Sequence, residues 1–275
     1  MLQEPDSYVT LDTYLKLYTD DSNKLKLPTR LTDDILKLLV NKYNLPQQTL
    51  GLIHHIVVSI VQARNGQSKI DPNTDEGKEI LEYNGYTGTR TRHFYNNICN
   101  SDVLNNIKYL EIGTWNGSSS ISAVYKNNIT GLFIDNWSQF GGDSQIFIDN
   151  ASKFGKSSSI FLLESDCWDV DLKDLDMAPF NIYLFDGDHA ELDHFKSLEY
   201  YYPVLDNIFI FIVDDWNWPN VRDGTMRAID KLNLNVLFRH EEFVSQDELH
   251  NMPNHYGKKT WWNGMACFLL SKTKK

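Results

Sequence analysis

The chain has 275 residues, of which 41% are hydrophobic and 23% are charged, and its formal net charge is −11. The size and composition are those of a globular protein with one large domain and additional elements. The acidic balance argues against nucleic acid or an anionic membrane as the main partner, because either would select a basic surface.

Three cysteines, Cys99, Cys167 and Cys267, are spaced too widely for a C-x-x-C zinc motif. Their odd number and the lack of a signal-peptide pattern in the first ten residues favour a reducing, cytoplasmic location. The longest apolar-rich segment, residues 51–63, is too short and too polar to span a bilayer. We therefore expect no membrane partner.

The first hundred residues carry helical periodicity. Residues 31–43, 45–64 and 89–99 each repeat apolar side chains at the spacing of a helix, and the polar stretch 65–84 is expected to be a loop. We predict that residues 1–100 form a helical N-terminal extension. It would pack on the rest of the protein and cover its site, or mediate homo-oligomer formation.

A different pattern covers residues 101–275. Short apolar runs alternate with polar or glycine-rich loops and helical stretches, which is typical of strands buried on both faces. Seven strands are expected, at residues 108–112, 131–135, 159–164, 181–186, 207–213, 235–243 and 264–272. Repeated βαβ units predict an α/β, Rossmann-like, doubly wound and mostly parallel sheet. Ligands of such a sheet bind at the carboxyl ends of its strands.

The first expected strand ends in the pattern E-x-G-x-x-x-G, formed by Glu111, Gly113 and Gly117. Glycines at this place allow a tight turn and a close approach of the backbone to a ligand. The pattern is not the dinucleotide motif G-x-G-x-x-G, because Trp115 stands at the second glycine position. A purely structural glycine turn is the alternative, although a carboxylate such as Glu111 at the end of a buried strand needs a partner.

Acids also follow the next two strands. Asp135 lies about 20 residues after the glycines, where a carboxylate is suited to bind both hydroxyls of a ribose. Asp166 follows the third strand, where it could hold an adenine amino group or simply cap a helix. Three acids in succession at one edge of the sheet favour a nucleoside-containing ligand.

These motifs resemble those of the class I S-adenosylmethionine-dependent methyltransferases, and the resemblance covers roughly residue 108 to the C-terminus. It implies S-adenosylmethionine as the cofactor. The residues that it assigns to cofactor binding are Glu111, Gly113, Thr114, Gly117, Ser118, Asp135, Asp166, Cys167, Trp168 and Asp186. Among these, the glycine motif would line the methionine side, Asp135 would bind the ribose, and the loop 166–168 would border the adenine.

A second acidic cluster is expected after the fourth and fifth strands. The stretch after the fourth strand contains Asp186, Asp188 and His189, and the fifth strand ends at Asp214 and Asp215. Neighbouring strands lie roughly 4.8 Å apart, so these carboxylates would repel one another unless a cation lay between them. Oxygen ligands favour Mg²⁺, Mn²⁺ or Ca²⁺ over zinc.

The two acidic motifs also resemble the metal-dependent, macrocin-type sugar O-methyltransferases, with one departure: Asp206 and Asn207 replace a glycine pair before the fifth strand. By this resemblance Asp186, Asp214 and Asp215 bind Mg²⁺ or Mn²⁺, and His189 is the general base. Asp188 is a competing base. The partner would be a small molecule or glycan that offers a sugar hydroxyl or another vicinal diol, which the metal would orient and acidify.

Several alternatives remain open at this stage. A catechol-type O-methyltransferase would use the same metal chemistry on a flat acceptor. Because Asp186 and Asp188 also form a D-x-D motif, a nucleotide-sugar glycosyltransferase is a second alternative, although it leaves E-x-G-x-x-x-G unexplained. A non-catalytic binding domain is a third, and Asp188 could merely cap the following helix.

Side chains outside these motifs suggest further contacts. Arg92 or His93 could contact the cofactor or the acceptor, and Trp216 and Trp218 could form an apolar wall for a sugar ring. Trp261 and Trp262 could form the same wall, or they could equally belong to the core or to a subunit contact, and His194 is expected on a helix face.

Overall fold

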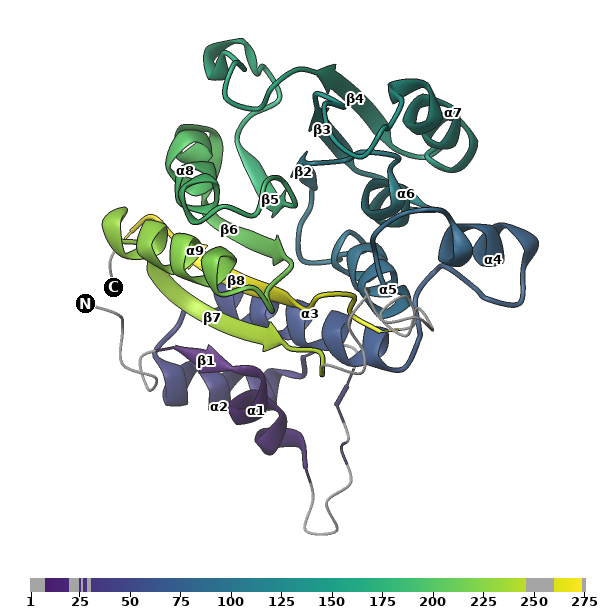
Figure 1. Ribbon diagram of the computed structural model, residues 1–275. Helices are drawn as coiled ribbons and strands as arrows, with labels where there is room; N and C mark the ends of the chain where they lie inside the picture. Colours follow the sequence, from purple (N-terminus) through teal and green to yellow (C-terminus); the bar gives the residue numbers. More distant parts are fainter. Residues whose placement is uncertain (1–7, 20–24, 26, 29–30, 246–259, 274–275) are drawn as a thin grey trace.

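The protein is a three-layer α/β structure in which helices cover both faces of one eight-stranded sheet (Figure 1). The computed structural model describes residues 8–19, 25, 27–28, 31–245 and 260–273. The strands are β1 (Val9–Thr10), β2 (Lys108–Ile112), β3 (Thr130–Asp135), β4 (Ser159–Glu164), β5 (Phe180–Phe185), β6 (Leu205–Asp214), β7 (Asn235–Glu242) and β8 (Met265–Ser271).

Among the described residues, five α-helices lie between β1 and β2, and four more lie between later strands. They are α1 (Leu11–Leu15), α2 (Asp33–Tyr43), α3 (Gln47–Arg64), α4 (Asp75–Glu82), α5 (Thr89–Ile98), α6 (Ser118–Val124), α7 (Ser144–Phe154), α8 (Glu191–Tyr201) and α9 (Pro219–Lys231). Short 3₁₀ helices lie at η2 (Lys16–Tyr18), η3 (Leu172–Asp174) and η4 (Tyr202–Val204). Among the described residues, no helix is both long enough and apolar enough to cross a membrane.

The strand order is β1-β7-β8-β6-β5-β2-β3-β4, which makes the sheet doubly wound. The chain enters the middle of the sheet at β2, builds β3 and β4 outward on one side, and then returns to build β5 and β6 on the other. All pairs are parallel except those that β8 makes with β6 and β7. The order therefore reverses between β2 and β5, and ligands of doubly wound sheets bind outside the carboxyl ends of the strands at such a switch point.

Alternation along the strands divides the interior into two hydrophobic cores. In β2, Tyr109 belongs to the core that includes side chains of α3, α5, α6 and α7, whereas Leu110 and Ile112 belong to the core that includes those of α8 and α9. Successive strand side chains point to opposite faces, so a strand buried on both faces must be apolar at nearly every position. This explains the continuous apolar runs of the sequence.

The prediction of seven strands is wrong by one. Val9 and Thr10 form an additional edge strand, β1, parallel to β7. Two residues carry no periodicity, so no local pattern could indicate this strand. The expected loop at 65–84 contains the short helix α4, whose start Thr74 caps by accepting a hydrogen bond from the N–H of Gly77.

The N-terminal helices belong to the body of the protein. Ten residues of α3 are buried, and its apolar side chains share a core with α5 and with one face of the sheet. The expected packing of this region on the sheet is therefore present. A domain division at residue 100 remains a prediction.

Candidate functional site

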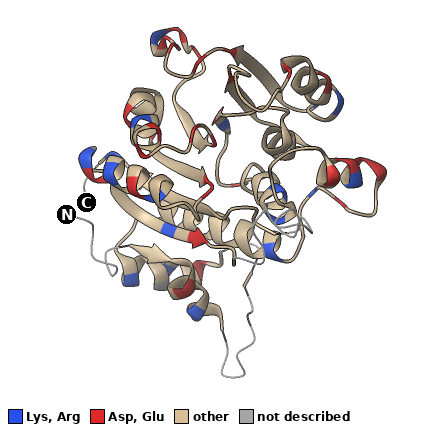
Figure 2. Ribbon diagram, in the orientation of Figure 1, with Lys and Arg blue, Asp and Glu red and all other residues tan. Residues whose placement is uncertain are grey.

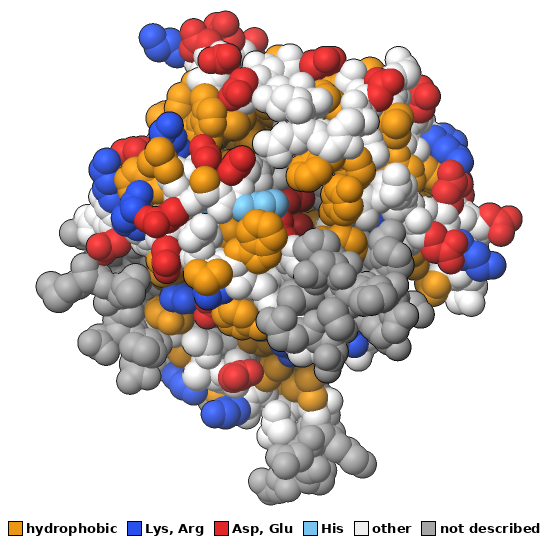
Figure 3. Space-filling view, in the orientation of Figure 1, with side chains coloured by type: hydrophobic (Ala, Val, Ile, Leu, Met, Phe, Trp, Pro, Cys, Tyr) orange, Lys and Arg blue, Asp and Glu red, His pale blue; other side chains and the backbone are white. Residues whose placement is uncertain are grey.

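A cavity of about 590 Å³ opens at the carboxyl ends of the central strands. Its walls come from the loops that follow β2, β3, β4, β5 and β6, together with residues 86–87 and 262–263. Figure 3 shows a hollow bordered by apolar side chains, with acidic side chains and a histidine beside it. Figure 2 places acidic positions along the loops after the central strands, whereas Lys and Arg are scattered over outer helices. The volume is within the usual range for small-molecule sites.

The turn after β2 requires a glycine at its first position. Gly113 has φ +87°, and its N–H donates to the carbonyl of Ile134 in the neighbouring strand β3. A Cβ at this residue would lie well under 3.0 Å from the backbone carbonyl oxygen of Asp186. Gly113 therefore lets the loops after β2 and β5 approach each other at the switch point. Thr114 and Ser118, from the same motif, line the cavity.

Glu111 lies behind the cavity wall. Its side chain is fully buried and accepts hydrogen bonds from the hydroxyls of Tyr109 at 2.8 Å and of Ser119 and Ser120 at 2.6 Å each. Burial raises the pKa of Glu111 more than these bonds lower it. The carboxylate thus fixes the start of α6 against β2. Gly117, with φ +91°, caps that helix and packs beside Phe147, also away from the lining.

Asp135 lines the cavity with both carboxylate oxygens already oriented. One accepts the backbone N–H of Trp115 and the other that of Trp137, each at 2.7 Å. A carboxylate has about four acceptor sites, so further hydrogen bonds from a ligand remain possible. The ribose-binding role of Asp135 stays a prediction.

The loop after β4 also lines the cavity through Asp166, Cys167 and Trp168. Asp166 accepts the backbone N–H of Trp168 at 2.9 Å, which fixes a turn; no helix begins there, so the helix-cap interpretation is wrong. Burial raises the pKa of the Cys167 thiol to about 12, which leaves it protonated and poorly nucleophilic at neutral pH.

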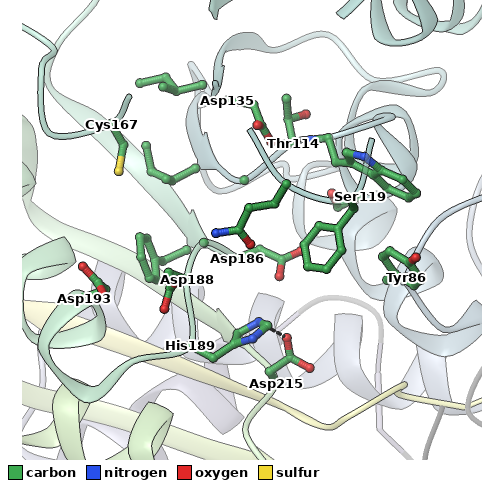
Figure 4. A pocket seen from close by; sticks show the side chains of 18 of the residues that line it. Tyr86, Thr114, Ser119, Asp135, Cys167, Asp186, Asp188, His189, Asp193 and Asp215 are labelled. Atoms are coloured by element: carbon green, nitrogen blue, oxygen red, sulfur yellow. Dashed lines mark hydrogen bonds and ion pairs between the residues drawn. The ribbon is translucent and has the colours of Figure 1, made fainter. Parts of the chain in front are cut away.

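The other half of the cavity contains a histidine–aspartate pair. His189 Nε2 lies 2.6 Å from Oδ2 of Asp215, and Figure 4 shows the two side chains pointing toward each other. Burial lowers the pKa of His189, but the hydrogen bond and the charge of Asp215 together raise this pKa by more, so the net shift is upward. The ring of Trp218 packs edge-on against His189 with centroids 4.5 Å apart.

Two carboxyl groups beside this pair lie close to other acids. Burial, followed by the charges of Asp214 and Asp215, raises the pKa of Asp186 well above its ordinary value. Burial and the charge of Asp215 do the same for Asp214, which is 2% exposed. One oxygen of Asp214 is buried and has no hydrogen-bond partner among the residues that the structure describes.

A divalent cation would fit this donor set. Ligand atoms of Asp186, His189 and Asp215 all lie within 4.8 Å of one another. The carboxylates are the hard oxygen donors that Mg²⁺ and Mn²⁺ accept, and a cation would compensate the buried acids. The group contains two of the three predicted ligands, with His189 in place of Asp214. Metal binding by any of them is still a prediction.

Asp188 lines the same cavity and holds the turn before α8, but it does not cap that helix, whose N-cap residue is Ala190 and has no side-chain cap. Its carboxylate accepts the backbone N–H of Ala190 at 2.9 Å. Asp186 and Asp188 therefore have different partners rather than forming one D-x-D pair. Asp193, which sequence reasoning missed, also lines the cavity from the first turn of α8, and Figure 4 shows it near Asp188.

Aromatic side chains form a second group, in which sequence reasoning considered Trp262 but missed Tyr86, Trp115 and Phe140. Tyr86 stacks on Trp115 with centroids 4.9 Å apart and planes 11° apart. Phe140 and Trp262 contact Tyr86 at 5.6 and 5.9 Å. Tyr86 and Phe140 are 50% and 65% exposed, so the cavity has an apolar wall that is open to solvent. These residues are far apart in the sequence, and only tertiary structure brings them together.

In each of the two expected tryptophan pairs, one ring lines the cavity and the other is buried. Trp218 lines the cavity, but the prediction for Trp216 is wrong, because its ring is fully buried against Phe268. Trp262 lines the cavity, whereas Trp261 is buried against Phe94.

The prediction that Arg92 or His93 contacts a ligand is not supported. Arg92 is 2% exposed and donates to the carbonyls of Ile80, Tyr83 and Thr87, so it holds the segment that carries Tyr86. His93 is buried, and its ring lies within 2.8 Å of the Ser68 hydroxyl. The prediction of His194 on a helix face is correct: it is buried and packs on Phe185.

No model of a known protein family matches this sequence, and no curated protein matches it. Among solved structures, the chain is similar to the O-methyltransferase TomG from Streptomyces achromogenes, involved in tomaymycin synthesis and solved with SAM, with a TM-score of 0.40 and 12% identity over 88% of this chain and 92% of that chain. It is also similar to the O-methyltransferase from Bacillus cereus in complex with SAH, with a TM-score of 0.41 and 13% identity over 86% and 97%.

A third similar structure is the ribosomal protein L11 methylase from Lactobacillus delbrueckii subsp. bulgaricus, with a TM-score of 0.42 and 14% identity over 68% of this chain and 78% of that chain. All three TM-scores are below 0.5, so the function is inferred from the cavity itself.

Proposed function

We propose that the protein is an S-adenosylmethionine-dependent O-methyltransferase that uses Mg²⁺ or Mn²⁺ and methylates a hydroxyl of a sugar or other vicinal diol. The observation that carries the proposal is one cavity at the switch point of the sheet. Loops after β2, β3 and β4 supply the glycine turn and two acids on one side. The loops after β5 and β6 supply the His189–Asp215 pair and the half-buried Asp186 on the other.

The cofactor would occupy the part of the cavity bordered by Gly113, Asp135 and Asp166. S-adenosylmethionine supplies a methyl group on a sulfonium, which is already a good leaving group. The close approach of backbone at Gly113 and the hydroxyls of Thr114 and Ser118 suit the polar end of such a ligand. Asp135 is rigidly held by two backbone N–H groups and so presents its remaining acceptor sites in a fixed direction.

The acceptor hydroxyl would lie beside His189. Asp215 holds Nε2 of the ring, which leaves Nδ1 as the nitrogen that takes the proton from the hydroxyl. Asp215 also stabilises the imidazolium that forms, in the way that a carboxylate orients and supports a catalytic histidine. When bound, a divalent cation would make the hydroxyl more acidic and hold two neighbouring oxygens in one orientation.

The chain's own residues thus account for three requirements of the reaction. Asp186 and Asp215 would bind the cation, and His189 would hold the proton. Trp218 and the wall around Tyr86 would exclude water and pack on the acceptor ring. Methyl transfer itself needs mainly alignment of the hydroxyl with the methyl group, which these walls would provide.

The same arrangement would serve a catechol, and the aromatic wall favours that second candidate as far as ring packing is concerned. The glycosyltransferase alternative is less well supported. Asp188 accepts the N–H of Ala190 and does not belong to the group of ligand atoms that contains Asp186.

The experiment that tests the proposal is a methyl-transfer assay. The protein is incubated with S-adenosylmethionine, Mg²⁺ and a panel of sugar-bearing and catechol acceptors, and the release of S-adenosylhomocysteine is measured with and without chelator. Metal-dependent release with a sugar or diol supports the proposal. Release only with catechols favours the second candidate, and hydrolysis or transfer of a nucleotide sugar instead would contradict both.

A further inference from the structure

The antiparallel strand β8 brings an additional segment to the site. Because β8 runs against β6, its first residue, Met265, pairs with Asp214, the last residue of β6. The pairing continues beyond both strands: Trp216 N–H donates to the Gly264 carbonyl at 3.2 Å and Asn217 N–H to the Asn263 carbonyl at 2.8 Å. The turn before β8 is therefore fixed against the loop that contains Asp215.

Within this turn, Asn263 contacts the carboxylate of Asp215 directly. Its Nδ2 donates to Oδ1 of Asp215 at 2.5 Å, and the Asn263 side chain is buried. The other oxygen of Asp215, Oδ2, lies 2.6 Å from His189. Each oxygen of the carboxylate thus has its own partner, so the Asn263 amide determines which oxygen faces His189.

The backbone at Asp215 makes such support necessary. Asp215 has φ +54°, a left-handed conformation that is uncommon for a residue other than glycine. A side chain on a strained turn keeps one orientation only when its surroundings hold it. Asn263 is suited to this because its turn is held independently, by Gly264 N–H to the Trp261 carbonyl and by Arg90 N–H to the Thr260 carbonyl, each at 3.0 Å.

We infer that Asn263 is a positioning residue for the cation and base site: its amide fixes Oδ1 of Asp215 so that Oδ2 is presented to His189 and to a divalent cation. The inference rests on the proposed function. Hydrogen-bond partners of metal ligands typically contribute 10–100-fold to metal affinity. Loss of the Asn263 amide should therefore weaken cation binding by about this factor.

Asn217 offers a matched control in the same loop. Its side-chain amide donates to the carbonyl of Val244 at 2.8 Å and accepts the Val244 N–H at 3.1 Å, so it joins the loop to the end of β7. Asn217→Ala removes partly buried amide contacts from the loop and leaves the Asn263–Asp215 bond in place, whereas Asn263→Ala removes a buried contact. A merely structural role of Asn263 would make the two variants alike.

The test is calorimetric titration of Mn²⁺ into the full chain, with S-adenosylmethionine binding measured separately on each protein. We expect Asn263→Ala and Asn263→Leu to bind Mn²⁺ about 10–100-fold more weakly than wild type, with cofactor binding unchanged and Asn217→Ala like wild type in both. Asn263→Leu keeps the volume of the side chain if the alanine variant does not fold.

Equal Mn²⁺ affinity in wild type and the Asn263 variants would overturn the inference and leave the proposed function intact. Wild-type protein that binds S-adenosylmethionine but no Mn²⁺ would overturn the inference together with the metal requirement. Failure of both Asn263 variants to fold while Asn217→Ala folds would also count against it, because a structural role would then be sufficient.

Discussion

The substitution Gly113→Ala tests the geometry of the switch point most sharply. Gly113 has φ +87°, and an added Cβ would collide with the backbone carbonyl of Asp186, which cannot move without shifting the loop after β5. Gly141 is the matched control, because it has φ +64° but no heavy atom within 4 Å of an added Cβ.

The two substitutions share one cost and differ in another. A non-glycine residue in a left-handed or similar conformation costs roughly 1–3 kcal/mol, and both variants should lose this amount. Overpacking against fixed atoms adds about 1–3 kcal/mol, and only Gly113→Ala should lose this as well. For a protein of this size the difference corresponds to roughly 2–12 °C in Tm.

The assay is thermal or urea unfolding of both variants, followed by calorimetric titration with S-adenosylmethionine. Gly113→Ala should unfold at a lower temperature than Gly141→Ala and should lose cofactor affinity. Equal stability of the two variants, with equal cofactor affinity, would refute the idea that the loops after β2 and β5 meet at Gly113.

Three further predictions concern titratable residues. His189→Asn should lower the methyl-transfer rate by about 10²–10⁴-fold with little change in cofactor affinity. Asp188→Asn should lower this rate by less. A larger loss of rate in Asp188→Asn than in His189→Asn would assign the base role to Asp188. Asp214→Asn should stabilise the cation-free protein by roughly 1–3 kcal/mol at neutral pH, because burial raises the pKa of that carboxyl and one of its oxygens has no hydrogen-bond partner among the described residues. Since the folded-state pKa of Asp214 lies above the unfolded one, this gain in stability should shrink as the pH falls. A Tm that is unchanged at every pH would contradict the prediction. Burial lowers the pKa of His194 to about 3, so the unfolded chain takes up a proton below about pH 6.5 that the folded chain does not, and wild type should lose about 2 kcal/mol at this residue between about pH 7.5 and 5. Urea unfolding of wild type and His194→Leu at both pH values checks this. The variant should lack that part of the stability loss, and the same pH dependence in both proteins would show that His194 is not its source.

Local patterns predicted several strands of the sheet closely. The expected ranges 108–112 and 159–164 coincide with β2 and β4, because each is a short run bounded by polar residues. The meeting of the acids at one edge of the sheet followed from parallel topology alone, since the carboxyl ends of parallel strands share an edge.

Features that depend on tertiary contacts were not predictable in the same way. Trp216 and Trp218 have the same local sequence signal, but the backbone after Asp215 turns one ring into the core and the other toward the cavity. Glu111 accepts hydrogen bonds from three hydroxyls within the fold, and no linear motif could indicate these partners.

Asn263 is an intermediate case. Its residue type carries no signal, and its place follows only from the antiparallel pairing of β6 and β8. Once that pairing is known, the segment before β8 must lie beside the end of β6, and a side chain in contact with Asp215 is expected there.

The most direct test of the central claim is calorimetric titration of the wild-type chain with S-adenosylmethionine, with and without Mg²⁺. The proposed function predicts binding at micromolar concentrations in both conditions, with the cavity at the switch point as the site. If S-adenosylmethionine bound neither with nor without Mg²⁺, and a nucleotide sugar did bind, the proposed function would be contradicted. Gly113, Asp135 and Asp166 would then lose their proposed cofactor role.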